Sequence, residues 1–95
     1  MFVVLLRFSS HRDQAARLLA AHNEWLRSGF DDGVFLLAGS IQPAAGGAIL
    51  AHGVSHADLQ RRVDADPFVA AGVVDAEIIA VSPAKTDPQL AFLLG

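Results

Sequence analysis

The chain opens with the stretch that decides its fold, Phe2-Val3-Val4-Leu5-Leu6-Arg7-Phe8. This stretch has strand length and consists mainly of β-branched and large apolar residues, which predicts a β-strand that ends at Ser9-Ser10. Apolar residues at both odd and even positions are typical of a strand that is covered on both faces. A sheet built around this strand therefore needs helices on one face and further cover on the other.

A helix is predicted to follow this strand. The residues from Ser10 to Asp13 have the form of a capping box, in which the serine oxygen accepts the amide hydrogen three residues on. Apolar residues then recur at helical spacing until Gly29 supplies a stop, which predicts a helix over about residues 11–28. Its apolar face contains Ala15, Leu18, Leu19, Trp25 and Leu26, with Asn23 and the charged residues largely away from it.

The rest of the chain is predicted to contain three more strands and a second helix. Strands are predicted at 34–38 and 48–51, paired as a hairpin around a loop at 40–47, and a last strand is predicted at 73–81. A second helix begins at Ser55, which repeats the Ser-His-x-Asp form, and ends at Asp66-Pro67. The order βαββαβ predicts an α+β, ferredoxin-like fold, with a four-stranded antiparallel sheet and two helices on one face.

The predicted domain covers residues 1–85, and residues 86–95 form a short tail. Asp87 before Pro88, with Gly95 at the end, predicts a terminal helical turn or two. The tail is too apolar to remain free in water, so we expect it to dock on the core or on a partner subunit.

The composition predicts association with a second copy. Of the 95 residues, 53% are hydrophobic and only 18% are charged, which is a high apolar content for a monomer of this size. The strand residues are apolar on both faces, and the simplest cover for the open face of the sheet is the same face of another subunit. We therefore expect a homodimer formed through the open sheet face.

Charge and cysteine content exclude several classes of partner. The seven basic residues are scattered and the net charge is −3, so no basic stripe is present to bind nucleic acid. The longest apolar region, 68–81, is interrupted by Asp75 and Glu77 and is too short to span a membrane. The absence of cysteine excludes disulfides and thiolate metal sites, and His52 and His56 are not spaced for a shared helical face. We expect a soluble, cytoplasmic protein without a metal site.

His22 is a titratable residue in an apolar environment, one helical turn after Leu18 and one before Leu26. One interpretation is a buried neutral histidine that is satisfied by a single hydrogen-bond partner. The other is a general acid/base on the inner wall of a pocket, for which an imidazole is suited because it titrates near neutral pH.

Asp66 also has two interpretations. Its carboxylate can cap a short helical turn that begins at Pro67, a role worth about 0.5–2 kcal/mol. Alternatively, because a residue before proline avoids the α conformation, Asp66 lies at a bend from which its side chain can point inward. From there it would orient His22 and stabilise the imidazolium ion.

Three motifs together resemble those of the YciI-like (YCII-related) family. They are Leu18-Leu19-Ala20-Ala21-His22 in the first helix, a strand that ends Leu37-Ala38-Gly39-Ser40, and Ala65-Asp66-Pro67-Phe68-Val69-Ala70-Ala71-Gly72-Val73. The resemblance covers about residues 1–85 and implies a ferredoxin-like fold that pairs into a dimeric α/β barrel. It also implies a pocket in which the family's histidine and aspartate correspond to His22 and Asp66. A related member removes chloride from a hydroxylated aromatic ring.

The expected function is that of a small acid/base enzyme that uses no cofactor. It would be a lyase, isomerase or dehydrochlorinase that acts on a small cyclic or aromatic compound, with His22 and Asp66 as catalytic residues. Trp25 and Phe68 would wall the pocket, and Ser40, where relatives often carry proline, would contact the substrate. The alternative is a non-catalytic ligand-binding or accessory dimer, in which the same pair only recognises a polar group.

Overall fold

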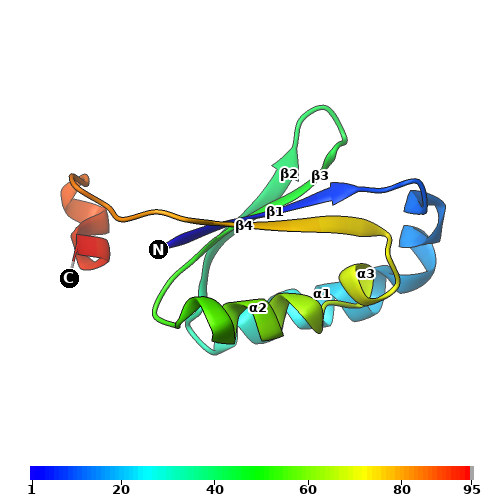
Figure 1. Cartoon of the computed structure of the whole chain (residues 1–95), viewed down its shortest axis with the longest axis horizontal. Coiled ribbons are helices and arrows are strands. Elements are labelled where there is room, and N and C mark those ends of the chain that lie inside the picture. Colours follow the sequence, from blue (N-terminus) through cyan, green and yellow to red (C-terminus); the bar gives the residue numbers. More distant parts are fainter. Residues whose placement is uncertain (95) are drawn as a thin grey trace.

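Four antiparallel strands form one sheet, and the helices lie on one face of it (Figure 1). The structure is a computed structural model that describes residues 1–94. The strand order is β2-β3-β1-β4, which confirms the predicted ferredoxin-like α+β arrangement. Within the described residues, no helix combines the length and the apolar character needed to cross a bilayer. In chain order the main elements are β1 (Phe2–Phe8), α1 (Ala15–Asp31), β2 (Phe35–Ile41), β3 (Gly46–Ala51), α2 (His56–Asp64), α3 (Pro67–Ala70) and β4 (Val74–Ala80).

The core lies between the sheet and the helices. Val4 of β1 and Ile49 of β3 are directly opposite each other and buried, so both point toward the helix layer. Leu59 and Val63 of α2 are fully buried and lie one helical turn apart. They form the one apolar face of this helix, and this face packs into the core. This packing fixes the helix layer over the sheet.

The opposite face of the sheet carries a row of apolar side chains that crosses all four strands. Leu37 of β2 pairs with Leu50 of β3, Leu50 pairs with Val3 of β1, and Val3 pairs with Ile79 of β4. Paired residues share a face, so these four side chains form a continuous band, which we call the outer row. Leu37 is 58% exposed and Ile79 is 39% exposed. No element of residues 1–94 covers the outer row (Figure 1).

The first helix begins later than the sequence indicated. A 3₁₀ turn at Arg12–Gln14 precedes α1, and the predicted capping by Ser10 is wrong, because neither the turn nor α1 has a side-chain cap. Instead, the Ser9 hydroxyl accepts a hydrogen bond from the His11 amide and donates to the Gly72 carbonyl. The chain is therefore held at Ser9 by the segment before β4, and the helix forms only after the turn.

The first helix also continues beyond the predicted stop. Gly29 lies inside α1 and is buried there because the Phe35 ring packs against it, so that an added Cβ would be 2.1 Å from a ring carbon. The helix ends at Asp31, and Gly33 follows with a φ of +73°. The amides of Gly33 and Val34 donate to the carbonyls of Phe30 and Gly29, which is the Schellman pattern of a helix C-terminus.

The hairpin is longer than the predicted strands, because residues expected in a loop belong to the ladder. Ser40 pairs with Gly47, and Ile41 with Gly46. Gly46 is required both by its backbone conformation, which has a φ of +132°, and by close packing, since an added Cβ would be 2.0 Å from the Leu6 carbonyl oxygen. The second half matches its prediction more closely, as Ser55 caps α2 by accepting from the Asp58 amide.

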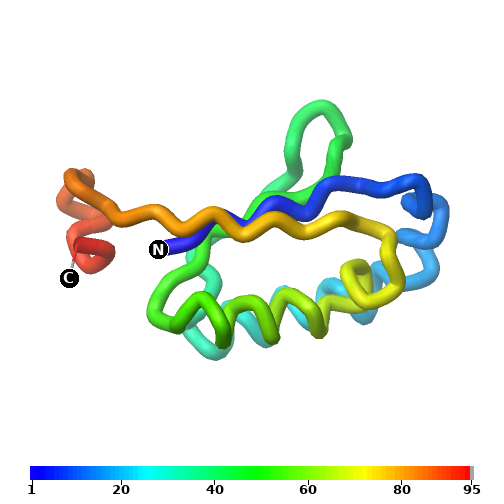
Figure 2. Tube along the Cα trace, viewed as in Figure 1, coloured from blue at the N-terminus to red at the C-terminus, as the bar shows by residue number. Residues whose placement is uncertain are grey.

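The tail leaves the end of β4 and runs past the sheet on the side where the N-terminus lies (Figure 2). A 3₁₀ helix spans Pro88–Leu94, and the Phe92 ring meets the His52 ring edge-on at a centroid distance of 5.4 Å. Phe92 remains 54% exposed. Gly95, predicted to end this turn, lies outside the described residues. Docking of the tail on a partner stays a prediction.

Candidate active site

His22 projects from the middle of α1 toward the sheet. The apolar residues of the helix bring this face inward, and the His22 side chain is only 12% exposed. Leu19 and Leu26 lie one turn before and one turn after it and line the same cavity. The imidazole therefore occupies a site from which water is largely excluded.

Asp66 lies at the bend between α2 and α3. Its backbone is extended, as expected for a residue before proline, and Pro67 occupies the first position of α3. The Oδ1 atom accepts a hydrogen bond of 3.0 Å from the Phe68 amide and thus caps the short helix. The side chain is fully buried.

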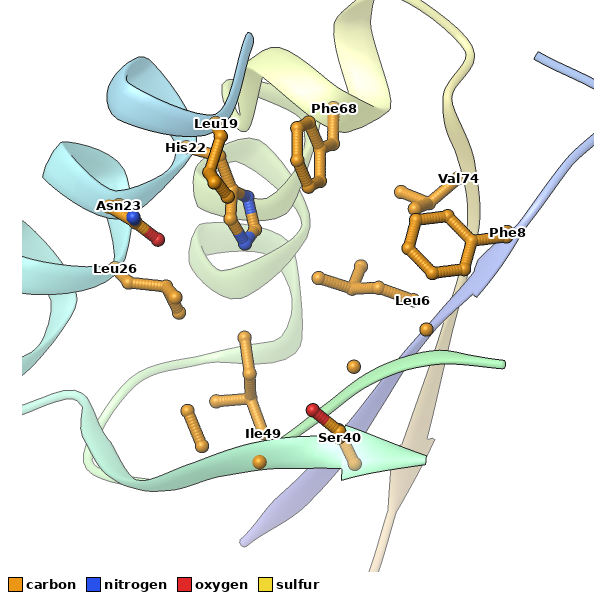
Figure 3. A pocket seen from close by; sticks show the side chains of 15 residues that line it. Leu6, Phe8, Leu19, His22, Asn23, Leu26, Ser40, Ile49, Phe68 and Val74 are labelled. Carbon is orange, nitrogen blue, oxygen red and sulfur yellow. The ribbon is translucent and has the colours of Figure 1, made fainter. Parts of the chain in front are cut away.

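The same oxygen also binds His22. The Nδ1 atom of His22 lies 2.7 Å from Oδ1 of Asp66, so the two roles considered for this carboxylate are filled by one atom. Because a carboxylate only accepts hydrogen bonds, Nδ1 carries the proton and donates a hydrogen bond to Oδ1. In the neutral ring, the lone pair is then on Nε2. Figure 3 shows that this edge of the ring points into the cavity.

Two aromatic rings stack with the His22 imidazole. Phe68 stacks on His22 in a nearly parallel arrangement, with a centroid distance of 4.0 Å and an interplanar angle of 6°. Trp25 lies at 5.7 Å and 30°. The Trp25 indole donates to the Arg62 carbonyl at 2.8 Å and packs against Phe35. Phe68 contacts His22 and also lines the cavity. Trp25 contacts His22 but does not line the cavity.

A cavity of about 300 Å³ separates this face of the helix from the sheet (Figure 3). Its walls are mostly apolar, and the sheet side is built from small residues of the hairpin. Ser40 is among them, so the sequence-predicted contact residue faces His22 across the cavity. The fifteen lining residues are Leu6, Phe8, Leu19, His22, Asn23, Leu26, Ala38, Gly39, Ser40, Gly46, Gly47, Ala48, Ile49, Phe68 and Val74.

Asn23 is the functional candidate that the sequence did not reveal. Periodicity placed it away from the apolar face, yet it lines the cavity next to His22. The sequence did contain a signal for this position. Asn23 lies four residues after Leu19 and three before Leu26, and residues at such spacings share a helix face. The glycines of the hairpin were also missed, since their composition indicated only a loop.

The arrangement has the parts needed for proton transfer. A histidine whose second nitrogen is fixed by a carboxylate is held in one tautomer and one orientation, and the carboxylate stabilises the imidazolium that forms when Nε2 takes a proton. The other carboxylate oxygen, Oδ2 of Asp66, is buried and has no partner within residues 1–94. No group of three or more metal-ligating side chains is found in that part of the chain.

Comparison with known proteins gives a family and a structural neighbour. A family model described as the YCII-related domain matches residues 1–82. No curated protein matches the chain. Among solved structures, the chain is similar to 5-chloro-2-hydroxyhydroquinone dehydrochlorinase from Burkholderia phenoliruptrix, in complex with 2,5-dihydroxybenzoquinone. The TM-score is 0.69 at 17% identity, over 85% of this chain and 93% of that one, which shows a shared fold.

Proposed function

We propose that this chain, which belongs to the YCII-related domain family, is an acid/base enzyme that acts on a small cyclic or aromatic compound without a cofactor. The observation that carries the proposal is the hydrogen bond of 2.7 Å between His22 and Asp66, with the free edge of the imidazole turned into an apolar cavity. The structural neighbour, a dehydrochlorinase with a dihydroxybenzoquinone bound, supports a ring compound with oxygen substituents.

His22 acts as the proton acceptor in this proposal. Its Nε2 takes a proton from a hydroxyl or an acidic C–H group of the bound compound, and the His22 imidazole becomes an imidazolium ion. Asp66 stabilises that cation through Nδ1. The parallel Phe68 ring adds attraction for the cation and keeps the imidazole in its plane. Proton transfer of this kind contributes about 10²–10⁴-fold to a rate.

Two reaction outcomes follow from this step. In an isomerisation, the imidazolium returns the proton to another atom of the same ring. In an elimination, the electron pair of the bond that held the proton is used to form a new double bond. A leaving group such as chloride departs with the electron pair of the bond that held it. The imidazolium then releases its proton to water, so the net products are the unsaturated ring and HCl.

The test is a turnover screen with hydroxylated and chlorinated aromatics and small lactones, followed by ultraviolet absorbance and chloride release. We expect turnover by the wild type and a loss of about 100-fold or more in His22→Gln and Asp66→Asn. Glu24→Gln is the matched control, because Glu24 is an exposed neighbour whose ion pair within residues 1–94 is with Arg27. Ligand binding without chemistry across the panel would instead favour a non-catalytic binding protein.

We propose further that the protein is a homodimer formed through the outer row. Four apolar residues in line across a sheet are a large patch for so small a chain to expose, and a second copy offers a complementary row. The ion pair between Arg7 and Glu77, at 2.8 Å, lies on the same face and would border the contact.

Light scattering after size exclusion tests the dimer. We expect the mass of two chains for the wild type and of one chain for Leu50→Glu, because a charge in the centre of the outer row cannot be buried without a partner. Ala57→Glu, at an exposed position of α2, is the control and should remain dimeric. A wild-type protein that elutes with the mass of one chain would contradict the proposal.

A further inference from the structure

The tail has apolar side chains that the rest of the chain leaves in water. Leu90, Phe92 and Leu94 of its 3₁₀ helix are 41%, 54% and 51% exposed. The Phe92 ring meets the His52 ring, but the helix makes at most sparse contact with the other helices and strands of residues 1–94. Figures 1 and 2 show that it stands apart from the sheet and from the helix layer. The tail is therefore not packed into the domain that precedes it.

The dimensions of the molecule agree with this. The radius of gyration is 13.6 Å, whereas a compact domain of 95 residues has about 12.4 Å. The accessible surface is 5708 Å², whereas a compact monomer of 10.0 kDa exposes about 5,200 Å². The excess is roughly 500 Å², and a stable interface takes about 800 Å² from each partner. The excess surface is thus too small to form an interface unless a neighbouring apolar surface joins it.

The outer row is that neighbouring surface. Val81 lies two residues after Ile79, and its amide donates to the Met1 carbonyl, which continues the ladder between β4 and β1. Alternate residues of a strand share a face, so Val81 is on the face of the outer row, and it is 39% exposed. The exposed apolar surface therefore continues from the outer row through Val81 toward the tail.

The opposite end of the same face is charged. Arg7 lies four residues after Val3 in β1 and therefore shares its face, and it pairs with Asp75 of β4. Glu77, two residues after Asp75, forms the ion pair of 2.8 Å with Arg7. The outer face is thus apolar at the end from which the tail leaves and charged at the other end.

This uneven distribution selects one way of pairing the face with its copy. Two sheets that pack face to face with aligned strands can be related by a two-fold axis along the strands or across them. An axis across the strands lays each tail over the partner's charged end, where apolar side chains would remove water from the ion pair. An axis along the strands keeps the two apolar ends together. It also sets edge strand β4 of one copy over edge strand β2 of the other, because the strand order is reversed between the copies.

We propose that the tail helix is an arm that docks on a second copy of this chain, against the partner's β2 at Leu37. In the pairing along the strands, the Ile79 end of one outer row meets the Leu37 end of the other, and the tail leaves β4 beside it. Leu37 is 58% exposed, more than any other large apolar side chain of the described residues. The match to the family model ends at residue 82, so the arm lies beyond the shared domain. This inference rests on the dimer proposed above.

A membrane surface fits the arm less well than a second copy does. Between Val81 and Leu94 the chain has one basic residue, Lys85, and one acidic residue, Asp87. Segments that bind a membrane surface combine their apolar residues with an excess of lysine and arginine, which attracts anionic lipids. The arm has no such excess.

Single cysteines can report the contact directly, because the chain contains no cysteine of its own. Leu37→Cys and Leu90→Cys variants are prepared separately, mixed, left to exchange subunits and treated with a short bismaleimide. We expect a product with the mass of two chains, in which mass spectrometry shows residue 37 of one chain joined to residue 90 of the other. Neither variant alone should give a dimeric product, because the axis along the strands separates the two copies of each residue.

The control mixture combines Leu90→Cys with Ala57→Cys, an exposed position of α2 on the helix side of the sheet, and should stay uncrosslinked. Equal crosslinking in the control mixture would overturn the inference. A dimeric product from Leu90→Cys alone would also overturn it, because the two tails would then meet each other and not β2.

The energetic test removes the apolar side chains of the arm in the full chain. In the triple variant Leu90→Ser, Phe92→Ser and Leu94→Ser, the dissociation constant of the dimer should rise by at least about tenfold in sedimentation experiments. The circular dichroism spectrum should stay unchanged, because these side chains lie outside the core. The matched control is Gln89→Ser with Ala91→Ser in the same helix, which should keep the wild-type dissociation constant. An unchanged constant in the triple variant would overturn the inference.

The arm and the earlier proposals fail in different ways. If Leu50→Glu separates the dimer and the triple variant does not weaken it, the dimer through the outer row stands and the arm is wrong. If the wild type has the mass of one chain, both are wrong. The turnover screen is independent of the arm, which leaves β4 at the end of the sheet opposite to Phe8 and Val74 of the cavity lining.

Discussion

Replacing Asp66 by alanine should affect both the stability of the protein and its chemistry, because one oxygen of this side chain accepts two hydrogen bonds. Oδ1 accepts from the Phe68 amide at 3.0 Å and from Nδ1 of His22 at 2.7 Å, and the side chain is fully buried. Alanine removes the cap of α3 and leaves the His22 donor without a partner. Asp66→Asn keeps an acceptor at the Oδ1 position and is the matched comparison.

The magnitude follows from these two contacts. Loss of the helix cap costs about 0.5–2 kcal/mol, and an unsatisfied buried donor costs about 1–3 kcal/mol, so Asp66→Ala should lower the free energy of unfolding by about 3 kcal/mol. At 4–8 °C per kcal/mol, Tm should fall by about 12–24 °C. Asp66→Asn should cost only about 1 kcal/mol, because its nitrogen replaces Oδ2, which already lacks a partner in residues 1–94.

Urea denaturation followed by circular dichroism measures both variants, and the turnover assay described above measures their chemistry. Asp66→Asn should be folded and inactive, since the amide has no charge to stabilise an imidazolium ion. Equal stability of the alanine and asparagine variants would refute the double role of Oδ1. Full activity of Asp66→Asn would refute the role of its charge.

Three further substitutions test the fold and the cavity. Gly29→Ala should lower the free energy of unfolding by about 1–3 kcal/mol in denaturation experiments, because its Cβ would overlap the Phe35 ring, and a gain in stability would contradict this packing. Ser55→Ala should cost about 0.5–2 kcal/mol, and Ser10→Ala, which removes no cap, less than about 0.5 kcal/mol; equal costs would argue against the observed caps. Gly47→Val should retain the circular dichroism spectrum but lower turnover by about tenfold in the screen described above, because the added methyl groups enter the cavity opposite Ser40. Unchanged turnover would show that the reaction takes place elsewhere.

The element order could be predicted because strand and helix periodicities are local properties of the sequence. The start of α1 could not, because Ser9 is held by a carbonyl in the segment before β4, far away in the chain. The end of α1 was missed for a similar reason. Gly29 looked like a helix stop, but it is a site of close contact with Phe35. In both cases a tertiary contact outweighed the local signal.

The candidate site was partly predictable. His22 was singled out because it interrupts the apolar face of a helix, and Asp66 because it lies at a bend before a proline. The structure brings the two side chains into hydrogen-bond contact. The cavity could not be foreseen, because its volume depends on which small residues of the hairpin pair with each other. That register places Gly47 opposite Ser40, and a shift by one residue would turn Ser40 to the other face.

The shared oxygen of Asp66 limits what a sequence motif can report. The Asp66-Pro67-Phe68 corner is retained for folding as long as α3 needs its cap, whether or not a reaction takes place nearby. A related chain can therefore keep this corner and have lost its chemistry. The informative pair is the corner together with a histidine at the place of His22, because the hydrogen bond that this imidazole makes within residues 1–94 is to a side chain and caps no helix. A search for active relatives should use both positions and treat the aspartate alone as a marker of architecture.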